Sequence, residues 1–191
     1  MIIGITGPIG SGKGRVAEFF HKKGFVHHSF SGEIRAIAKE RGIEINRKNL
    51  IKLGQDLRKE SPHRSIIGQN ILDNINKDIA EGAQRFVIEG IRDEDEINLF
   101  RHHEFESKKM RFILIGVDAP QEMRFERMKS RKRQGDPKTF REFKQIDDAE
   151  IRGDGGQEVS KCMKMADYTI KNDGTLKELE KKLQDMLSEI L

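Results

Sequence analysis

A glycine-rich segment near the amino end is the strongest constraint on what this chain can fold into. Residues 1–6 are a short apolar run, residues 7–14 read GPIGSGKG, and residues 15–23 have the pattern of a helix that ends at Gly24. Glycines let successive backbone N–H groups converge, and a following helix N-terminus adds its positive end. The spacing of glycine, four residues, glycine and lysine therefore predicts a phosphate-binding loop in a strand–loop–helix unit.

Four further apolar runs alternate with helical patterns along the chain. They cover residues 25–28, 85–88, 111–117 and 166–170, and a helix with a capping box at Thr175 and Glu178 follows the last one. This alternation predicts an α/β fold with a mostly parallel sheet, and no repeat or linker divides the 191 residues. Ligands of such sheets bind beyond the carboxyl ends of the strands, so functional residues are expected there.

The composition excludes several classes of protein. Hydrophobic residues make up 35% and charged residues 36%, and no apolar run approaches the roughly 18 residues that cross a bilayer. The amino end lacks the basic and apolar regions of a signal peptide. Cys162 is the only cysteine, which excludes an internal disulfide framework, and we expect it to be a buried helix residue. We therefore expect a cytoplasmic protein that does not bind membranes.

One segment carries most of the positive charge. Residues 124–144 hold nine basic and three acidic residues, a net charge of +6, against +4 for the whole chain. Such a cluster indicates a site for a polyanion. A nucleic acid is disfavoured, because only phenylalanines accompany the basic residues and stacking platforms are few. A small phosphate-rich ligand is favoured, and a solvated basic helix is the structural alternative.

The stretch IGITGPIGSGKGRVAEFF resembles the opening of dephospho-CoA kinases. Later stretches (FVIEGIRDEDEI, FILIGVDAPQEMRFERMKSRKRQGD and MADYTIKNDGTLKEL) resemble an archaeal-type family of nucleotide kinases related to dephospho-CoA kinase and adenylate kinase. The resemblance covers nearly the whole chain. It implies a single three-layer P-loop kinase domain of five parallel strands, with an acceptor-binding helical region at about 30–80 and a lid at about 127–152. ATP and Mg²⁺ are the implied cofactors.

The resemblance also assigns roles to individual residues. The ATP-binding residues it implies are Gly7, Pro8, Ile9, Gly10, Ser11, Gly12, Lys13, Gly14, Arg15, Arg127 and Asn172. Lys13 would reach the β- and γ-phosphates, and Glu89 matches a carboxylate that orients Mg²⁺ through water. Arg92 matches an arginine that grips the acceptor, and Arg127, Arg131 and Arg133 match lid arginines. The catalytic residues implied are thus Lys13, Glu89, Arg92, Arg127 and Arg131.

Two departures from the family pattern bear on the chemistry. Gly14 follows the loop lysine where Ser or Thr usually offers a hydroxyl to Mg²⁺, so the metal is held by other oxygens or held weakly. The segment after the second strand lacks the aspartates that dephospho-CoA kinases carry there. It offers Ser31, Glu33 and Arg35, which together with Arg58 and Arg92 form the expected acceptor site.

These features favour a nucleoside monophosphate as the acceptor, since its phosphate oxygen needs positioning rather than deprotonation. The closest alternative is dephospho-CoA kinase, with Glu33 or Glu89 as the base. An acceptor-free P-loop NTPase and a nucleic-acid-binding module are alternatives of other classes. The adjacent pairs His27–His28 and His102–His103 lack the helical spacing of a zinc site, so we expect structural or exposed histidines.

Overall fold

The computed structural model describes residues 1–60, 66–103, 110–131, 135–152 and 158–190. Its strands form one sheet in the order β2-β3-β1-β4-β5, and every neighbouring pair is parallel. The strands are β1 (Ile2–Thr6), β2 (Val26–Ser29), β3 (Phe86–Ile91), β4 (Phe112–Asp118) and β5 (Tyr168–Lys171). The expected five-stranded parallel sheet is confirmed.

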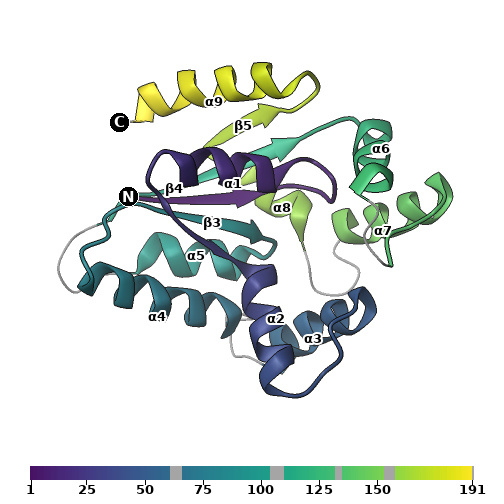
Figure 1. Cartoon of the computed structure of the whole chain (residues 1–191), viewed down its shortest axis with the longest axis horizontal. Helices are drawn as coiled ribbons and strands as arrows, with labels where there is room; N and C mark the ends of the chain where they lie inside the picture. Colours follow the sequence, from purple (N-terminus) through teal and green to yellow (C-terminus); the bar gives the residue numbers. More distant parts are fainter. Residues whose placement is uncertain (61–65, 104–109, 132–134, 153–157, 191) are drawn as a thin grey trace.

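Helices cover both faces of this sheet, which makes three layers (Figure 1). In the described part of the chain they are α1 (Lys13–Lys22), α2 (Phe30–Glu40), α3 (Arg47–Glu60), α4 (Ile66–Ala80), α5 (Glu94–His102), α6 (Gln121–Arg131), α7 (Phe140–Arg152), α8 (Val159–Lys164) and α9 (Leu176–Ile190). Helices α1 and α9 pack on one face, whereas α4, α5 and α8 pack on the other. The short helix α8 contains Cys162, which was expected in a buried helix.

The core follows from the alternation of side chains along each strand. On β1, Ile3 and Ile5 contact α1 and α9, while Ile2 contacts the opposite layer. All three are fully buried. At about 25 cal/mol per Å² of apolar surface, each such side chain stabilises the fold by about 1.5–3 kcal/mol. The capping box of α9 is also confirmed, because Thr175 N–H donates to Glu178 Oε2 over 2.7 Å.

The third strand runs three residues past the expected end at residue 88 and contains a bulge. On β1, Ile5 pairs with Glu89 and Thr6 pairs with Ile91, which leaves Gly90 unpaired with a φ of 95°. Only glycine adopts this backbone conformation without strain. The bulge lies between Glu89 and Arg92 at the carboxyl edge of the sheet, where the site was expected.

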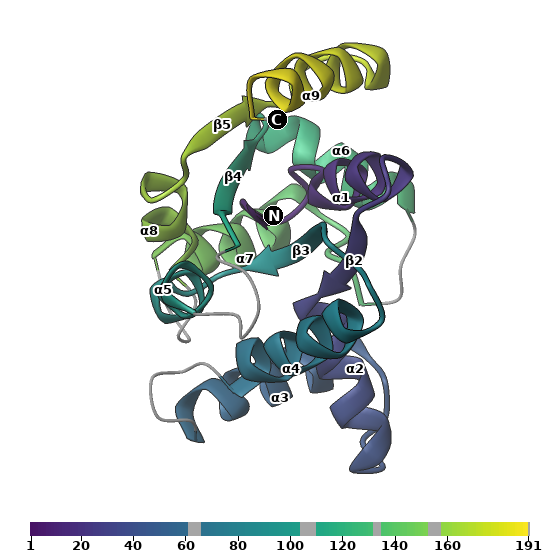
Figure 2. The ribbon, with the colours of Figure 1, turned by 90° about the vertical axis from the view of Figure 1, so that its left-hand side faces the viewer.

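Two helical groups flank this edge. Helices α2, α3 and α4 gather beside β2, at the opposite end of the sheet from α9 (Figure 2). Helices α6 and α7 lie beyond the carboxyl ends of the strands and share a small core of Ile9, Phe125, Met128 and Phe143. The first group spans the expected acceptor region and the second most of the expected lid. Among the described residues, none of the helices has the length and apolar character needed to cross a membrane.

Candidate active site

A cavity of about 1200 Å³ lies at the carboxyl edge of the sheet. Five parts of the chain line it: the glycine-rich loop, the facing sides of α2 and α3, the end of β3, helices α6 and α7, and the corner between β5 and α9. These are the places that the sequence predicted for a phosphate site, an acceptor site and a lid. The fold therefore brings the three predicted parts together around one space.

The loop has the backbone that its glycines permit. Gly7, Gly10 and Gly12 have φ values of 145°, 78° and 103°, which are conformations that other residues adopt only with strain. A Cβ on Gly12 would lie 2.2 Å from the Asn172 amide nitrogen, so a side chain is also excluded by space. The loop leads directly into α1, whose N-terminal amides suit an anion.

Lys13 lies beneath this loop and is buried. Its Nζ donates to the carbonyl oxygens of Gly7 at 2.6 Å and Pro8 at 2.9 Å. Burial, with a further contribution from the Arg92 charge, lowers the pKa of Lys13 to about 8, although Glu150 and Glu89 act in the opposite direction. A phosphate beside this ammonium would favour its charged form, so the site is suited to an anionic ligand.

The corner after β5 holds both the loop and α6. Asn172 Nδ2 donates to the Ser11 carbonyl at 2.8 Å, and Arg127 Nη2 donates to the Asn172 carbonyl at 2.9 Å. Arg127 Nη1 is buried and has no hydrogen-bond partner. A buried donor without an acceptor is costly, so this nitrogen fits an oxygen of a bound ligand.

Glu89 lies beside the position where the loop lacks a hydroxyl. A Cβ on Gly14 would lie 3.4 Å from Glu89 Oε1, and His27 Nε2 lies 3.4 Å from Glu89 Oε2. A carboxylate next to a phosphate loop is the kind of ligand that Mg²⁺ prefers. Glu89 is therefore the residue that would hold a magnesium ion at this loop, together with oxygens of the nucleotide. Within the described residues, no group of three or more His, Cys, Asp or Glu side chains could hold a metal ion.

Arg92 is positioned by a buried ion pair that joins α3 to α5. Arg92 N–H donates to Glu96 Oε2 over 2.9 Å, and Glu96 Oε1 accepts from Arg58 Nε over 2.9 Å. The side chains of Arg58 and Glu96 are 3% and 0% exposed, and burial raises the pKa of Glu96. Arg58 therefore lies in the cavity wall as predicted, but its guanidinium is directed to Glu96. Asp93 caps α5, because its Oδ1 accepts from Asp95 N–H over 3.0 Å.

The acceptor side of the cavity is a groove between α2 and α3. Arg35 lies in it and donates to the Ser31 carbonyl at 3.0 Å and to Ser31 Oγ at 3.2 Å. Glu33 is not among the residues that line the cavity, and its Oε1 accepts from Asn74 Nδ2 over 3.2 Å. The structure therefore does not bring Glu33 to the predicted acceptor site, because it lies on the side of α2 that packs against α4.

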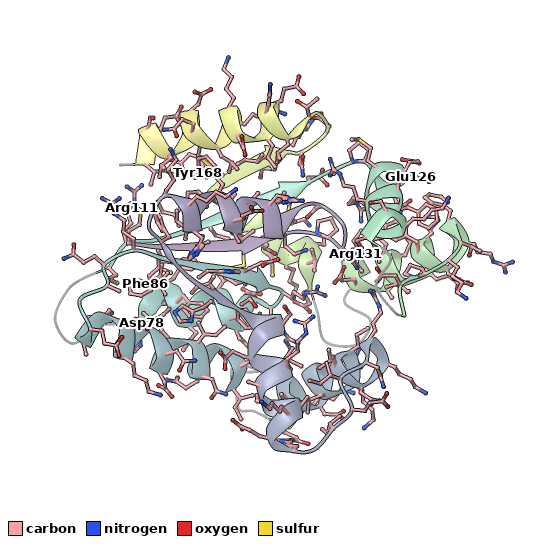
Figure 3. The ribbon with its side chains drawn as sticks, in the orientation of Figure 1. Asp78, Phe86, Arg111, Glu126, Arg131 and Tyr168 are labelled. Carbon is pink, nitrogen blue, oxygen red and sulfur yellow. The ribbon has the colours of Figure 1, made fainter. Side chains whose placement is uncertain are left out.

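Asp136, which lies between α6 and α7, links the end of α6 to α3. Arg131 Nε donates to Asp136 Oδ2 at 2.7 Å, and Arg47 Nη1 of α3 donates to Asp136 Oδ1 at 2.6 Å. Figure 3 shows Arg131 between α6 and α3, whereas Glu126 lies on the outer side of α6. Arg127 and Arg131 share a helix as predicted, and Arg133 lies outside the described residues. Nothing in the sequence indicated Arg47.

Helix α7 supplies two buried carboxylates that sequence analysis missed. Asp147 accepts two hydrogen bonds from Arg124, whose Nη1 also donates to the Ile9 carbonyl at 3.1 Å. Glu150 accepts from Ile9 N–H at 3.0 Å and forms an ion pair with Arg92. Their spacing of three residues places both carboxylates on one side of α7, which is the only signal the sequence carried.

The remaining predicted residues are less involved. Arg15 is exposed and pairs with Glu18 on α1. His28 pairs with Asp78 at 2.8 Å, a structural contact between β2 and α4. Cys162 is fully buried as expected, and burial raises its thiol pKa to about 12.

The fold and the loop define a protein with the P-loop kinase fold, in which helices cover both faces of a five-stranded parallel sheet. Residues 3–152 match the family described as AAA domain. The chain belongs to this family and to the UPF0200 family of archaeal proteins. It is 35% identical to the UPF0200 protein of Thermococcus gammatolerans over 100% of this chain and 96% of that protein. It is 34% identical to the UPF0200 protein of Pyrococcus horikoshii over 100% of this chain and 98% of that protein.

Solved structures show the same fold at low sequence identity. Shikimate kinase from Acinetobacter baumannii in complex with shikimate has a TM-score of 0.58 and 20% identity, covering 100% of this chain and 94% of that one. Dephospho-CoA kinase from Campylobacter jejuni has a TM-score of 0.53 and 20% identity, covering 99% of this chain and 96% of that one. These similarities confirm the predicted P-loop kinase fold.

Proposed function

We propose that this protein is an ATP-dependent kinase that transfers the γ-phosphoryl group to a nucleoside monophosphate bound between α2 and α3. The observation that carries the proposal is the position of Arg92. It lines the same cavity as Lys13 of the glycine-rich loop and Arg35 of the α2–α3 groove. A donor on the loop and an anionic acceptor in the groove would meet beside this guanidinium.

The donor side would bind the triphosphate through loop amides and charge. The N–H groups of residues 9–14 converge on the phosphates, Lys13 neutralises them, and Arg127 offers its unpartnered Nη1. Asn172, beside Gly12, belongs to the corner that lies next to the adenine in the resembling kinases. Magnesium ion, held through Glu89, supplies charge neutralisation on the phosphates when bound. The lid arginines Arg127 and Arg131 then surround the transferring group and exclude water.

The groove favours an acceptor with an apolar body and an anionic end. Ile34, Leu50 and Ile51 supply apolar walls, and Arg35 and Arg47 supply positive charge. Ile51 is 41% exposed, although large apolar side chains usually avoid water. A nucleobase would cover these walls while its phosphate contacts the arginines.

The chemistry of the acceptor end also favours a monophosphate. A hydroxyl acceptor needs a base, and Glu33, which follows β2, contacts Asn74 instead of the cavity. Glu89 is the carboxylate that keeps dephospho-CoA kinase as a second candidate, because it lies at the loop. We further infer that residues 127–152 act as the lid of a single domain and that the protein works in the cytoplasm without binding nucleic acid.

An acceptor panel tests the proposal. Purified protein is incubated with ATP, Mg²⁺ and each nucleoside monophosphate or dephospho-CoA, and products are separated by ion-exchange chromatography. A nucleoside diphosphate product supports the leading proposal, and coenzyme A supports the second candidate. ATP loss that no acceptor accelerates indicates an NTPase. Lys13→Ala should abolish the product, whereas Lys129→Ala on the exposed side of α6 should not.

A further inference from the structure

The cavity contains a carboxylate in contact with the groups expected to hold phosphate. Glu150 of α7 is 7% exposed, and its Oε2 accepts from the loop amide of Ile9 over 3.0 Å. Its Oε1 accepts from Arg92 Nη1. The Glu150 charge also acts on Lys13, whose ammonium it favours electrostatically. One carboxylate therefore contacts or influences the amide, the guanidinium and the ammonium of the phosphate machinery.

This set of partners is that of an anion site. Backbone amides of a glycine-rich loop, a guanidinium and a lysine together recognise the oxygens of a phosphoryl group. A buried carboxylate requires such partners too, because an unpaired buried charge is costly. Glu150 and a phosphoryl oxygen would therefore compete for Ile9 N–H and for Nη1 of Arg92.

The position of Glu150 is set by the rest of α7. Asp147, one turn earlier, is fully buried in an ion pair with Arg124. Arg124 of α6 also donates to the Ile9 carbonyl, while Glu150 of α7 accepts from the Ile9 N–H. Both backbone polar groups of Ile9 are therefore bound by side chains of these two helices. Phe143 of α7 packs beneath them against Ile9. The contact of Glu150 with the loop is thus built into the packing of the helix.

A second carboxylate repeats the arrangement at the acceptor side. Asp136 accepts from Arg131 and from Arg47, so it holds the end of α6 against α3. Arg92 and Arg131, two arginines expected to bind phosphate, are thus each paired with a carboxylate of the lid segment.

We propose that Glu150 is an internal substitute for the transferring phosphoryl group. Its carboxylate fills the anion position between Ile9 N–H and Arg92 and holds α7 against the loop. A polyphosphate displaces it and takes over the same donors. Removal of the Glu150 charge increases the fraction of the protein whose loop is free to bind a polyphosphate. The apparent affinity for polyphosphate rises by the same factor as this fraction. The inference rests on the proposed function only in requiring a polyphosphate ligand at the loop.

Binding of inorganic tripolyphosphate, measured by isothermal titration calorimetry, tests this inference without any reaction. Glu150→Gln keeps the shape of the side chain and removes its charge, and we expect Kd to fall about tenfold. Asp148→Asn is the matched control, because Asp148 is on the same helix and pairs only with Lys144 on the surface in the described contacts. Its Kd should equal that of the wild type.

The outcomes separate this inference from the proposed function. Unchanged or weaker binding by a folded Glu150→Gln protein would overturn it, as would a wild type and variant that both fail to bind. If that variant does not fold, Glu150→Asp replaces it, since a side chain one methylene shorter cannot reach both partners and should also bind more tightly. Tighter binding without any transfer in the acceptor panel would leave this inference standing and reject the kinase. Phosphoryl transfer in the acceptor panel, combined with unchanged tripolyphosphate binding by Glu150→Gln, would support the kinase and reject this inference.

Discussion

The ion pair of Arg58 and Glu96 offers a direct test of what Arg58 does. In Arg58→Met, Glu96 keeps its buried position but loses the guanidinium that neutralises it. Breaking a buried pair in this way costs about 3–5 kcal/mol. For a chain of this size about 2–4 °C is lost per kcal/mol, so the Tm should fall by roughly 6–20 °C.

The pH dependence of the loss identifies its cause. Burial already raises the pKa of Glu96, and removal of Arg58 raises it further. A carboxyl whose folded pKa exceeds its unfolded pKa destabilises the fold once pH rises above the unfolded value. The stability difference between Arg58→Met and wild type should therefore be larger at pH 8 than at pH 5. Thermal unfolding followed by circular dichroism at both pH values measures it.

Two control variants complete the experiment. Arg58→Met combined with Glu96→Leu removes both charges and should recover much of the lost stability. Lys59→Met changes an exposed neighbour and should stay within about 0.5 kcal/mol of wild type. The reasoning is refuted if the free energy of unfolding of Arg58→Met lies within about 1 kcal/mol of the wild-type value while its KM for the acceptor is raised. Arg58 would then act on the acceptor, as the sequence resemblance implies.

Three further predictions concern the loop and the buried thiol. Because the pKa of Lys13 is about 8, its charge is lost as pH rises through that value, and calorimetry should show tripolyphosphate affinity falling in wild type but not in Lys13→Met. Gly12→Ala places a Cβ against the Asn172 amide at a φ of 103°, and nucleotide binding should fall by about tenfold or more in a titration. Cys162, with a thiol pKa of about 12, should react with Ellman's reagent at pH 8 only at the rate of unfolding.

The sequence predicted the parts of this protein that depend on neighbours along the chain. The loop at residues 7–14 needs only glycines at fixed spacing between a strand and a helix, so its conformation and the position of Lys13 followed from local rules. The same applies to the shared helix of Arg127 and Arg131 and to the capping box of α9. Boundaries were less certain, since the bulge at Gly90 carries β3 beyond its expected end.

Only the tertiary structure decided how the charged residues pair. Arg58 and Glu96 are 38 positions apart, Arg92 and Glu150 are 58 apart, and Arg47 and Asp136 are 89 apart. Each pair depends on how segments far apart in the sequence pack together, and composition cannot distinguish a paired arginine from one that faces a ligand. For that reason Arg58 and Glu33 were predicted at the acceptor site, while Glu150 in the cavity lining was missed. Local backbone chemistry fixes the phosphate loop, but the packing of distant helices decides which charges reach it.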